Sequence, residues 1–460
     1  MPVSLLFLVL ILLTGASFWF GRARALGGVG GRSKDLHSLP GYYGHYVAIW
    51  CAVPALILLA FWLALEGRVI EGMVVSALPA EVAGLPANEL GLYLNDVRNL
   101  ATGGISTREL DPALEQAISQ YKGLRTGSNI AMTVLVLLFA VLGGILAHRR
   151  IAPRFRARNS VEKAVMTALK ICSLIAILTT VGIVLSLIFE SARFFEKVPV
   201  IDFLFGLEWS PQVALRKDQV GSSGLFGAIP LFAGTLFISF IAMCVAAPVG
   251  LLAAVFMSEY ASSKIRAWVK PMLEILAGIP TVVYGFFAAL TVAPLMRDTG
   301  ADFGLTISSE SALAAGIVMG VMIIPFVSSL SDDVISAVPQ SLREGSYGLG
   351  ATKSETIRQV VFPAALPGII GGLLLAASRA IGETMIVVMA AGLAANLTAN
   401  PFEAVTTVTV QIVTLLVGDQ EFDSAKTLAA FALGLVLFCV TLCLNIIALH
   451  VVNKYREQYE

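Results

Sequence analysis

The chain has 460 residues, of which 57% are hydrophobic and only 13% are charged, and its mean hydropathy is +0.83. The 31 basic and 31 acidic residues give a formal net charge of zero. A composition this apolar excludes a soluble globular protein and indicates a polytopic membrane protein. Without a basic excess, nucleic acid is not an expected partner.

Cysteine and histidine patterns point away from metal binding and covalent chemistry. The five cysteines all lie in apolar runs and form no C-x-x-C pair, so we expect small buried side chains rather than disulfides or metal ligands. The chain contains no H-E-x-x-H, P-loop or G-x-S-x-G motif. We therefore expect a protein without metal or cofactor that is not itself an enzyme.

Hydropathy predicts an all-α protein with about nine transmembrane helices. Each apolar run has about the 20 residues needed to cross a bilayer. The predicted spans are 2–20, 47–65, 129–147, 166–189, 228–257, 271–296, 312–330, 366–395 and 429–452.

Positive charges between the spans predict the orientation. The basic loops 21–34, 148–158 and 262–270 and the basic C-terminus are expected on the cytoplasmic side. The long segments 66–128 and 190–227 carry no such enrichment and are expected outside. The N-terminus is then outside, and the first span is an uncleaved helix because no basic segment precedes it.

The spans divide the chain into two parts. Residues 1–160 form an N-terminal extension with three spans and an external helical segment at 68–127, where Thr107 is a candidate N-cap. The role of this extension cannot be derived from its sequence. Residues 161–460 form a core of six spans and contain nearly all the informative sequence.

The first candidate site in the core is "AGIPTVVYG" at 277–285. Pro280 removes a helical hydrogen bond, and a helix break inside the membrane is tolerated only within protein or along a cavity. Tyr284 could offer its hydroxyl there. An ordinary membrane helix that happens to contain proline and glycine explains the stretch equally well. Glu274 is expected to meet Lys270, four residues before it.

The polar loop 331–365 is predicted to fold as two short helices at the cytoplasmic face. Gly350 is suited to end the first helix, because glycine tolerates the left-handed conformation of a helix stop. Thr352 and Glu355 form a capping box for the second helix, and Pro363 marks its end. The alternative is an ordinary folded loop without a partner.

The second candidate site is "RAIGETM" at 379–385, which places Arg379 and Glu383 inside a long apolar run. Their spacing predicts that they share one helix face and reach each other. Intramembrane charges usually serve function, although a structural ion pair remains open. A guanidinium matches phosphate oxygens, and a competing Glu383 would keep the empty site neutral. The predicted pathway residues are Arg379, Glu383, Ser378, Thr384, Pro280 and Tyr284.

The apolar segment 404–417 is too short and too rich in threonine to be a transmembrane span. If it crossed the membrane, the basic C-terminus would lie outside. We expect a re-entrant or interfacial helix.

The loop 331–365 resembles the "EAA" loop of ABC importer permeases. In that family a glycine follows the glutamate by six residues, as Gly350 follows Glu344, and a proline occupies the place of Pro363. Gly345-Ser346 replaces the alanine pair, so the helix is expected to be more flexible there. The resemblance implies docking on an ATP-binding subunit. The implied coupling residues are Arg343, Glu344, Gly350, Thr352, Glu355 and Pro363.

Within that family, residues from about 190 onward resemble the PstC-type permease of the phosphate-specific ABC importer. The stretches that carry this resemblance are 194–212, 226–239, 257–261, 274–288, 344–369 and 379–385. The resemblance implies a bacterial inner-membrane permease for inorganic phosphate, surrounded by membrane lipid. It further implies a PstA-type second permease, a PstB-type ATP-binding dimer and a periplasmic PstS-type phosphate-binding protein.

Three other functions remain open from the residues alone. The Arg379 and Glu383 pair does not choose between phosphate and another oxyanion such as sulfate or molybdate. An ion-coupled secondary transporter would need no ATP-binding partner, which the loop 331–365 argues against. A membrane scaffold or sensor without transport is the remaining class.

Overall fold

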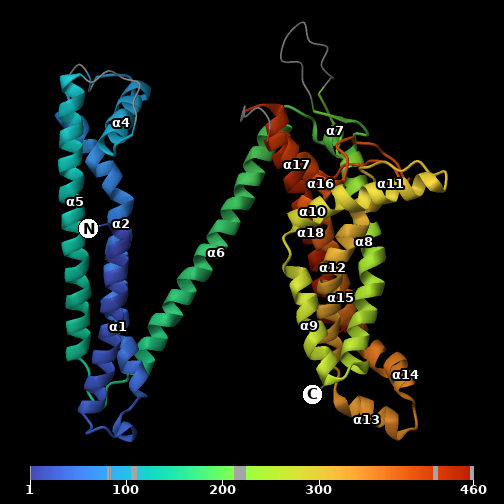
Figure 1. Ribbon diagram of the computed structural model, residues 1–460, viewed down its shortest axis with the longest axis horizontal. Helices are drawn as coiled ribbons and strands as arrows, with labels where there is room; N and C mark the ends of the chain where they lie inside the picture. The colour runs from blue at the N-terminus through green and yellow to red at the C-terminus, as the bar shows by residue number, and fades with distance from the viewer. Residues whose placement is uncertain are drawn as a thin grey trace. The chain divides into compact units, whose positions relative to one another are not determined.

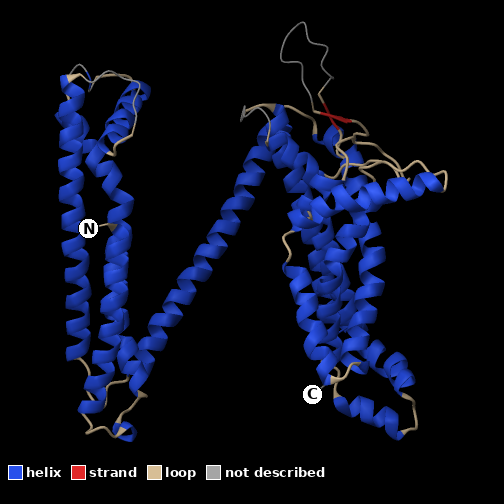
Figure 2. Ribbon diagram, viewed as in Figure 1, coloured by secondary structure: helices blue, strands red, loops and turns tan. Residues whose placement is uncertain are grey.

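A computed structural model describes residues 2–79, 82, 84–104, 111–211, 224–417 and 423–455. The described chain is almost entirely helical, with one two-stranded sheet (Figure 2). It divides into two compact units, Met1–Ile177 and Leu178–Glu460. The boundary falls inside the long helix α6 (Ala157–Phe195), because the core packing of each unit involves a different end of that helix.

The first unit is built from long apolar helices that pack along their length (Figure 1). The backbones of α2 and α5 approach closely at Gly143, where an added Cβ would lie 2.1 Å from the carbonyl oxygen of Trp50. The elements before α6 are α1 (Val3–Gly27), η1 (Ser33–Asp35), α2 (Pro40–Ala77), α4 (Ala87–Ala101) and α5 (Pro112–Arg149). Thr107, the predicted N-cap, lies outside the described residues, and the described helix α5 is capped by Asp111.

The second unit is a helical bundle around α12, which is the most buried of its long apolar helices. Its first elements are α7 (Val200–Phe205), β1 (Trp209–Ser210), β2 (Leu225–Phe226), α8 (Ile229–Val255), η2 (Phe256–Tyr260), α9 (Ser263–Gly278), α10 (Thr281–Phe287), η3 (Ala288–Val292), α11 (Ala293–Asp302) and α12 (Ala312–Ser336). It continues with α13 (Gln340–Gly348), α14 (Lys353–Thr356), η4 (Ile357–Val361), α15 (Phe362–Ile381), α16 (Met385–Ala390), α17 (Val408–Leu416) and α18 (Ala425–Tyr455).

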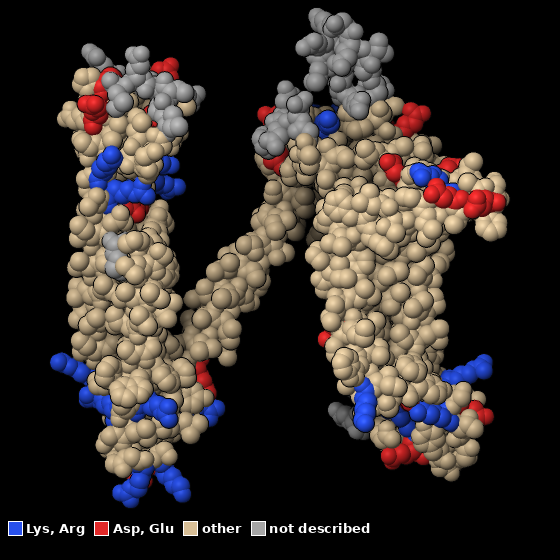
Figure 3. Space-filling model, in the orientation of Figure 1, with Lys and Arg blue, Asp and Glu red and all other residues tan. Residues whose placement is uncertain are grey.

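Small residues allow α8 and α12 to pack tightly. Added Cβ atoms at Gly316 and Gly320 would lie 2.6 Å from Ile241 and 2.8 Å from the carbonyl oxygen of Ala242, respectively. Close approach through small residues is a common way for membrane helices to associate. Charged side chains gather toward the two ends of this unit and leave a broad, nearly uncharged band between them (Figure 3). The band is what a hydrocarbon layer requires of a protein surface.

The structure agrees with the prediction of about nine spans. Among the described residues, eight helices are long and apolar enough to cross a membrane, and the bent pair formed by α9 with α10–α11 makes up to nine. Segment 404–417 contains only the nine-residue helix α17, about 14 Å long at 1.5 Å per residue, which is too short to cross. The predicted span 366–395 is interrupted, because α15 ends at Ile381.

The loop after α12 begins as predicted, with the short helix α13 and a second helix that starts after Thr352. The second helix does not end at Pro363 as expected, because it continues through η4 and α15 to Ile381. Gly350 adopts a φ of +87° after α13, the left-handed conformation that ends a helix. Thr352 and Glu355 form the predicted capping box at α14. The Thr352 hydroxyl and amide donate to Glu355 Oε2 at 2.7 and 2.8 Å, and these hydrogen bonds lower the pKa of Glu355.

Arg343 fixes α13 to the rest of the bundle. Its guanidinium donates to Glu259 Oε1 at 3.0 and 3.3 Å and to the carbonyl oxygens of Ile335, at 2.9 Å, and Val338. The two side chains are only 11% and 8% exposed. Glu259 belongs to η2, so the ion pair joins the end of α8 to the helix that follows α12. Arg343 was expected to couple to a partner, but its guanidinium is engaged within this chain.

Breaking this pair should loosen α13. Arg343→Met leaves the Glu259 carboxylate buried without its cation, a loss of about 3–5 kcal/mol for a buried pair. The double variant Arg343→Met with Glu259→Met should recover much of this, because apolar replacement of a buried pair is often tolerated. Thermal unfolding of the purified permease and protease cleavage within 331–365 measure the effect.

Arg358→Met is the matched control, since Arg358 is an exposed basic side chain of the same loop. We expect it to behave like the unmodified protein. Equal stability and equal protease resistance of Arg343→Met and Arg358→Met would show that the Arg343–Glu259 pair does not hold α13.

Candidate functional site

The predicted helix break at Pro280 is present. The axes of α9 and of the following pair α10–α11 differ by 84°. Pro280 is the residue before α10, with φ −56° and ψ 135°, so it both ends the run of helical conformation and starts the next helix. The break leaves carbonyl groups of the last turn of α9 without helical partners.

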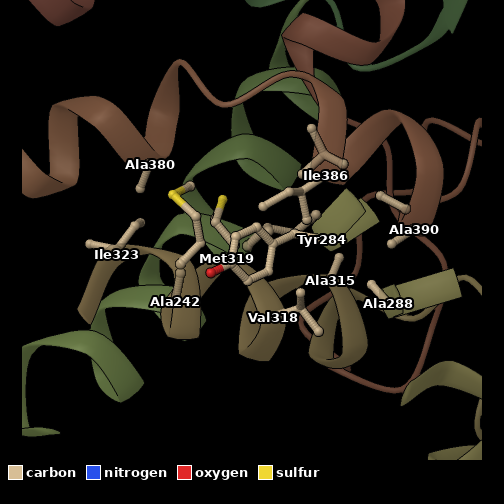
Figure 4. Close-up of a cluster of buried hydrophobic side chains, with 14 of the residues drawn as sticks. Ala242, Tyr284, Ala288, Ala315, Val318, Met319, Ile323, Ala380, Ile386 and Ala390 are labelled. Atoms are coloured by element: carbon tan, nitrogen blue, oxygen red, sulfur yellow. The ribbon is translucent and has the colours of Figure 1, made fainter. Parts of the chain in front are cut away.

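Tyr284 satisfies one of these carbonyl groups. Its hydroxyl donates to the carbonyl oxygen of Leu276 at 2.8 Å, across the break. The side chain is only 7% exposed and packs in the core of the bundle, beside Met319 and Ile386 (Figure 4). Tyr284 therefore has a structural role, because its hydrogen bond stabilises the bend between α9 and α10 from within the core.

A second break follows α15. The helix ends at Ile381, with Gly382 as its C-cap, and α16 begins at Met385. Glu383 turns onto the new helix, and its Oε1 accepts hydrogen bonds from the amides of Met385 at 3.2 Å and Ile386 at 3.5 Å. A carboxylate at a helix N-terminus is favoured by both the free amides and the helix dipole. The Thr409 hydroxyl donates to the Glu383 carbonyl oxygen at 2.9 Å.

The expected pairing of Arg379 with Glu383 is wrong for this structure. No ion pair joins them among those of the described residues, because the helix that would align positions four apart ends between them. Arg379 lies on the side of α15 that meets α9 and α12, whereas Glu383 lies beside Thr235 of α8 and Thr407. The two charges therefore have separate surroundings.

Arg379 lines a cavity of about 250 Å³ between α9, α12 and α15. Its guanidinium carbon lies 5.5 Å from the centre of the Phe326 ring, which is a cation–π distance. Within the described chain the guanidinium has neither a hydrogen bond nor a salt bridge. Its side chain is exposed, so it is available to a ligand. Such a cation is the kind of group that binds an oxyanion.

The other predicted pathway residues contribute less. The Thr384 hydroxyl donates to the carbonyl oxygen of Gly382 at 3.3 Å, which stabilises the turn between α15 and α16. Ser378 is half-buried, and its carbonyl accepts the amide of Gly382. The structure brings neither residue into the cavity beside Arg379.

The sequence analysis missed a charge cluster at the other end of the same cavity. The Asp332 carboxylate is 1% exposed and accepts both 3.0 and 2.9 Å hydrogen bonds from Arg266 Nη2 and a 3.2 Å bond from Lys270. Lys270 was expected to meet Glu274, but it lies instead against Asp332 and, at 3.7 Å, Asp333. Asp332 was assigned to the loop, whereas α12 continues to Ser336 and buries it.

The described residues hold no group of three or more histidine, cysteine or acidic side chains that could bind a metal. The arrangement of the cavity offers charged and hydroxyl ligands for a small ion. Such ligands support binding of a small ion.

Comparisons with known proteins agree with this. Residues 246–457 match the family of binding-protein-dependent transport system inner membrane components, and residues 7–179 match a family described as a phosphate ATP-binding cassette transporter. The probable ABC transporter permease YqgH of Bacillus subtilis is 35% identical over 272 residues, which are 59% of this chain and 84% of that protein.

The phosphate transport system permease PstC of Mesorhizobium japonicum is 32% identical, over 50% of this chain and 74% of the relative. The phosphate transport system permease PstC of Pasteurella multocida is also 32% identical, over 56% of this chain and 82% of the relative. Among solved structures, the MetNI methionine ABC transporter matches with a TM-score of 0.37 and 18% identity, covering 50% of this chain and 95% of that one.

The six core helices, the two-helix loop and the coverage of these relatives lead to one conclusion: the chain belongs to the family of ABC transporter permeases, the inner membrane components of binding-protein-dependent transport systems.

Proposed function

We propose that this permease forms part of the transmembrane pathway for inorganic phosphate in an ABC importer. The observation that carries the proposal is the Arg379 guanidinium, which lies in an otherwise apolar helix without a carboxylate partner in the described chain. Arg379 lies in the last turn of α15, and an arginine among membrane helices without an ion-pair partner is expected to serve function. The relatives named as phosphate permeases support phosphate as the anion.

Arg379 suits a conduit better than a storage site. A guanidinium can bind two phosphate oxygens at once, which favours entry of the anion. Conduction also requires that the ion can leave. The exposed position of Arg379 and its contact with the Phe326 ring, rather than a cage of donors, keep binding weak. High affinity then belongs to a phosphate-binding protein outside the membrane.

Substitution of Arg379 tests the proposal. Arg379→Ala should reduce phosphate transport at least about 100-fold while the permease still inserts and assembles, since no described ion pair is broken and a charge-assisted contact to the anion is lost. Arg379→Lys keeps the charge but loses the planar fork, so partial transport is expected. Uptake of labelled phosphate and sulfate into vesicles is the measurement.

Glu383→Gln is the matched control. The amide oxygen can still accept the hydrogen bonds of Met385 and Ile386, so α16 should keep its start and transport should fall far less than in Arg379→Ala. Normal phosphate uptake by Arg379→Ala would overturn the conduit. Preferred uptake of sulfate by the unmodified protein would replace phosphate as the substrate.

The second part of the proposal is that α13 and α14 dock on an ATP-binding subunit. On α13 and its C-terminal end, Tyr347 is 41% exposed and Leu349 is 91% exposed, and Glu344 is exposed beside them. Exposed apolar side chains with a charged neighbour are typical of a surface that a partner covers. A PstB-type dimer would supply ATP hydrolysis, and a PstA-type permease would complete the pathway.

Charge reversal at the docking surface tests this. Glu344→Lys should lower co-purification of the ATP-binding subunit at least about tenfold, because like charges or an unpaired charge at an interface disfavour docking. The helices of the bundle should stay folded, since Glu344 makes no contact that holds α13. Asp302→Lys, an exposed acidic residue on α11, should change nothing. Equal co-purification with both variants would argue against docking at α13.

We further propose that the N-terminus lies outside and the C-terminus in the cytoplasm of a bacterial inner membrane. In a chain without its native cysteines, Asn95→Cys on α4 should react with an impermeant thiol reagent in intact cells. Arg154→Cys, in the basic loop after α5, should react only after the membrane is opened. Both positions are exposed. The reversed labelling pattern would invert the topology.

A further inference from the structure

The cavity that contains Arg379 also contains a second cation from another helix. Its polar and aromatic lining residues are Lys270, Glu274, Phe326, Ser328, Ser329, Asp332 and Arg379. Lys270 comes from α9, Asp332 from α12 and Arg379 from α15, so three elements contribute charges. At about 250 Å³ the cavity has several times the roughly 30 Å³ share of one water molecule.

Lys270 is the exchangeable member of the charge cluster. Arg266 already contacts both oxygens of Asp332, at 3.0 and 2.9 Å. Lys270 adds a single contact to Asp332 at 3.2 Å and lies 3.7 Å from the exposed Asp333, and its side chain is 35% exposed. If Lys270 moved away, the buried carboxylate would keep a cation on both oxygens, so the usual penalty for an unpaired buried charge would not arise.

The charges of this cavity are balanced while it is empty. Lys270, Arg266 and Arg379 are matched in number by the carboxylates of Asp332, Asp333 and Glu274, and Lys270 itself lies 3.2 Å from Asp332 and 3.7 Å from Asp333. An entering anion would gain the free guanidinium of Arg379 and one ammonium released from Asp332. Departure of the anion would restore the Lys270–Asp332 contact. Competition of this kind lets a site bind an ion and then let it go.

We propose that Lys270 and Arg379 together form an oxyanion subsite between α9, α12 and α15, with Asp332 as the group that competes for Lys270. The proposal deepens the proposed function, since it rests on the passage of phosphate through this chain. The sequence predicted that Glu383 competes with the anion for Arg379. In the proposed subsite Asp332, on a different helix, competes with the anion for Lys270. Lys270 is then a second anion-binding side chain of the pathway.

Chemical protection at Ser329 tests the subsite directly. Ser329 lines the cavity and is partly exposed, and a serine-to-cysteine change is small. In the full-length permease purified in its membrane complex, with the five native cysteines replaced, Ser329→Cys is alkylated with neutral N-ethylmaleimide. A neutral reagent is used so that the charge of the cavity neither attracts nor repels the reagent, and half-protection is compared within each variant so that its own rate without phosphate is the reference. Orthophosphate should slow the reaction, and chloride at the same ionic strength should not.

The lysine variants decide whether the ammonium takes part. Lys270→Met should raise the phosphate concentration for half-protection about tenfold, the size expected for one charge-assisted hydrogen bond. Lys270→Arg should shift it far less. Lys264→Met is the matched control, because Lys264 is an exposed lysine of the same helix outside the cavity, and it should leave protection unchanged. Absence of protection, or equal protection in Lys270→Met and the unmodified chain, would overturn the subsite.

Failure of the subsite can be told apart from failure of the proposed function. If the unmodified complex transports phosphate while Lys270→Met leaves protection unchanged, the pathway stands and the subsite is wrong. If the complex transports sulfate and not phosphate, the proposed substrate is wrong. The same protection assay with sulfate then decides whether Lys270 and Arg379 bind the transported anion.

Discussion

The cost of a charge among helices that cross a hydrocarbon layer governs this structure. Such a charge has to be paired, exposed to an aqueous space or used, because the surrounding apolar groups do not solvate it. Asp332 shows the first solution, with two cations around a carboxylate that is 1% exposed. Arg379 forms no ion pair within the described chain, and its guanidinium has an aromatic ring and a cavity beside it. The paired and the unpaired charge share one cavity.

The same constraint applies to the backbone. A break in a membrane helix frees amide and carbonyl groups that have to find new partners within the protein. At the first break the Tyr284 hydroxyl binds the Leu276 carbonyl, and at the second the Glu383 carboxylate binds the amides at the start of α16. Tyr284 and Glu383 are therefore polar side chains within apolar sequence that stabilise the two helix breaks. Their presence alone does not place them in the pathway.

Sequence reasoning succeeded where the signal is local. The approximate number of spans, the break at Pro280, the left-handed Gly350 and the Thr352–Glu355 capping box depend on residues close together in the chain, and each is present. It failed where a distant element decides. The helical spacing of Arg379 and Glu383 predicts contact only if the helix continues, and the helix ends between them.

Two further contacts depend on distant residues in the same way. Lys270 has an acidic residue four positions away in Glu274, yet it contacts Asp332, which is 62 positions away. Arg343 precedes the docking surface in sequence, yet its guanidinium turns inward to Glu259, 84 positions away. Periodicity cannot rank a neighbour on the same helix against a better buried partner on another one. Asp332 nevertheless lies at the end of an apolar run. The expectation that charges within membrane helices are paired or functional could therefore have identified it from the sequence.

The contacts also connect α13 to the cavity. Arg343 binds Glu259 of η2 and the carbonyl oxygens of Ile335 and Val338 at the end of α12. Met257, two residues before Glu259 in the same π-helical turn, lines the cavity, and so does Asp332, one turn before Ser336. Displacement of α13 therefore has to break these bonds or move both cavity walls with it. Because a buried ion pair is costly to break, movement of the walls is the easier outcome. The Arg343–Glu259 pair thereby links a movement of α13 to the Lys270–Asp332 contact.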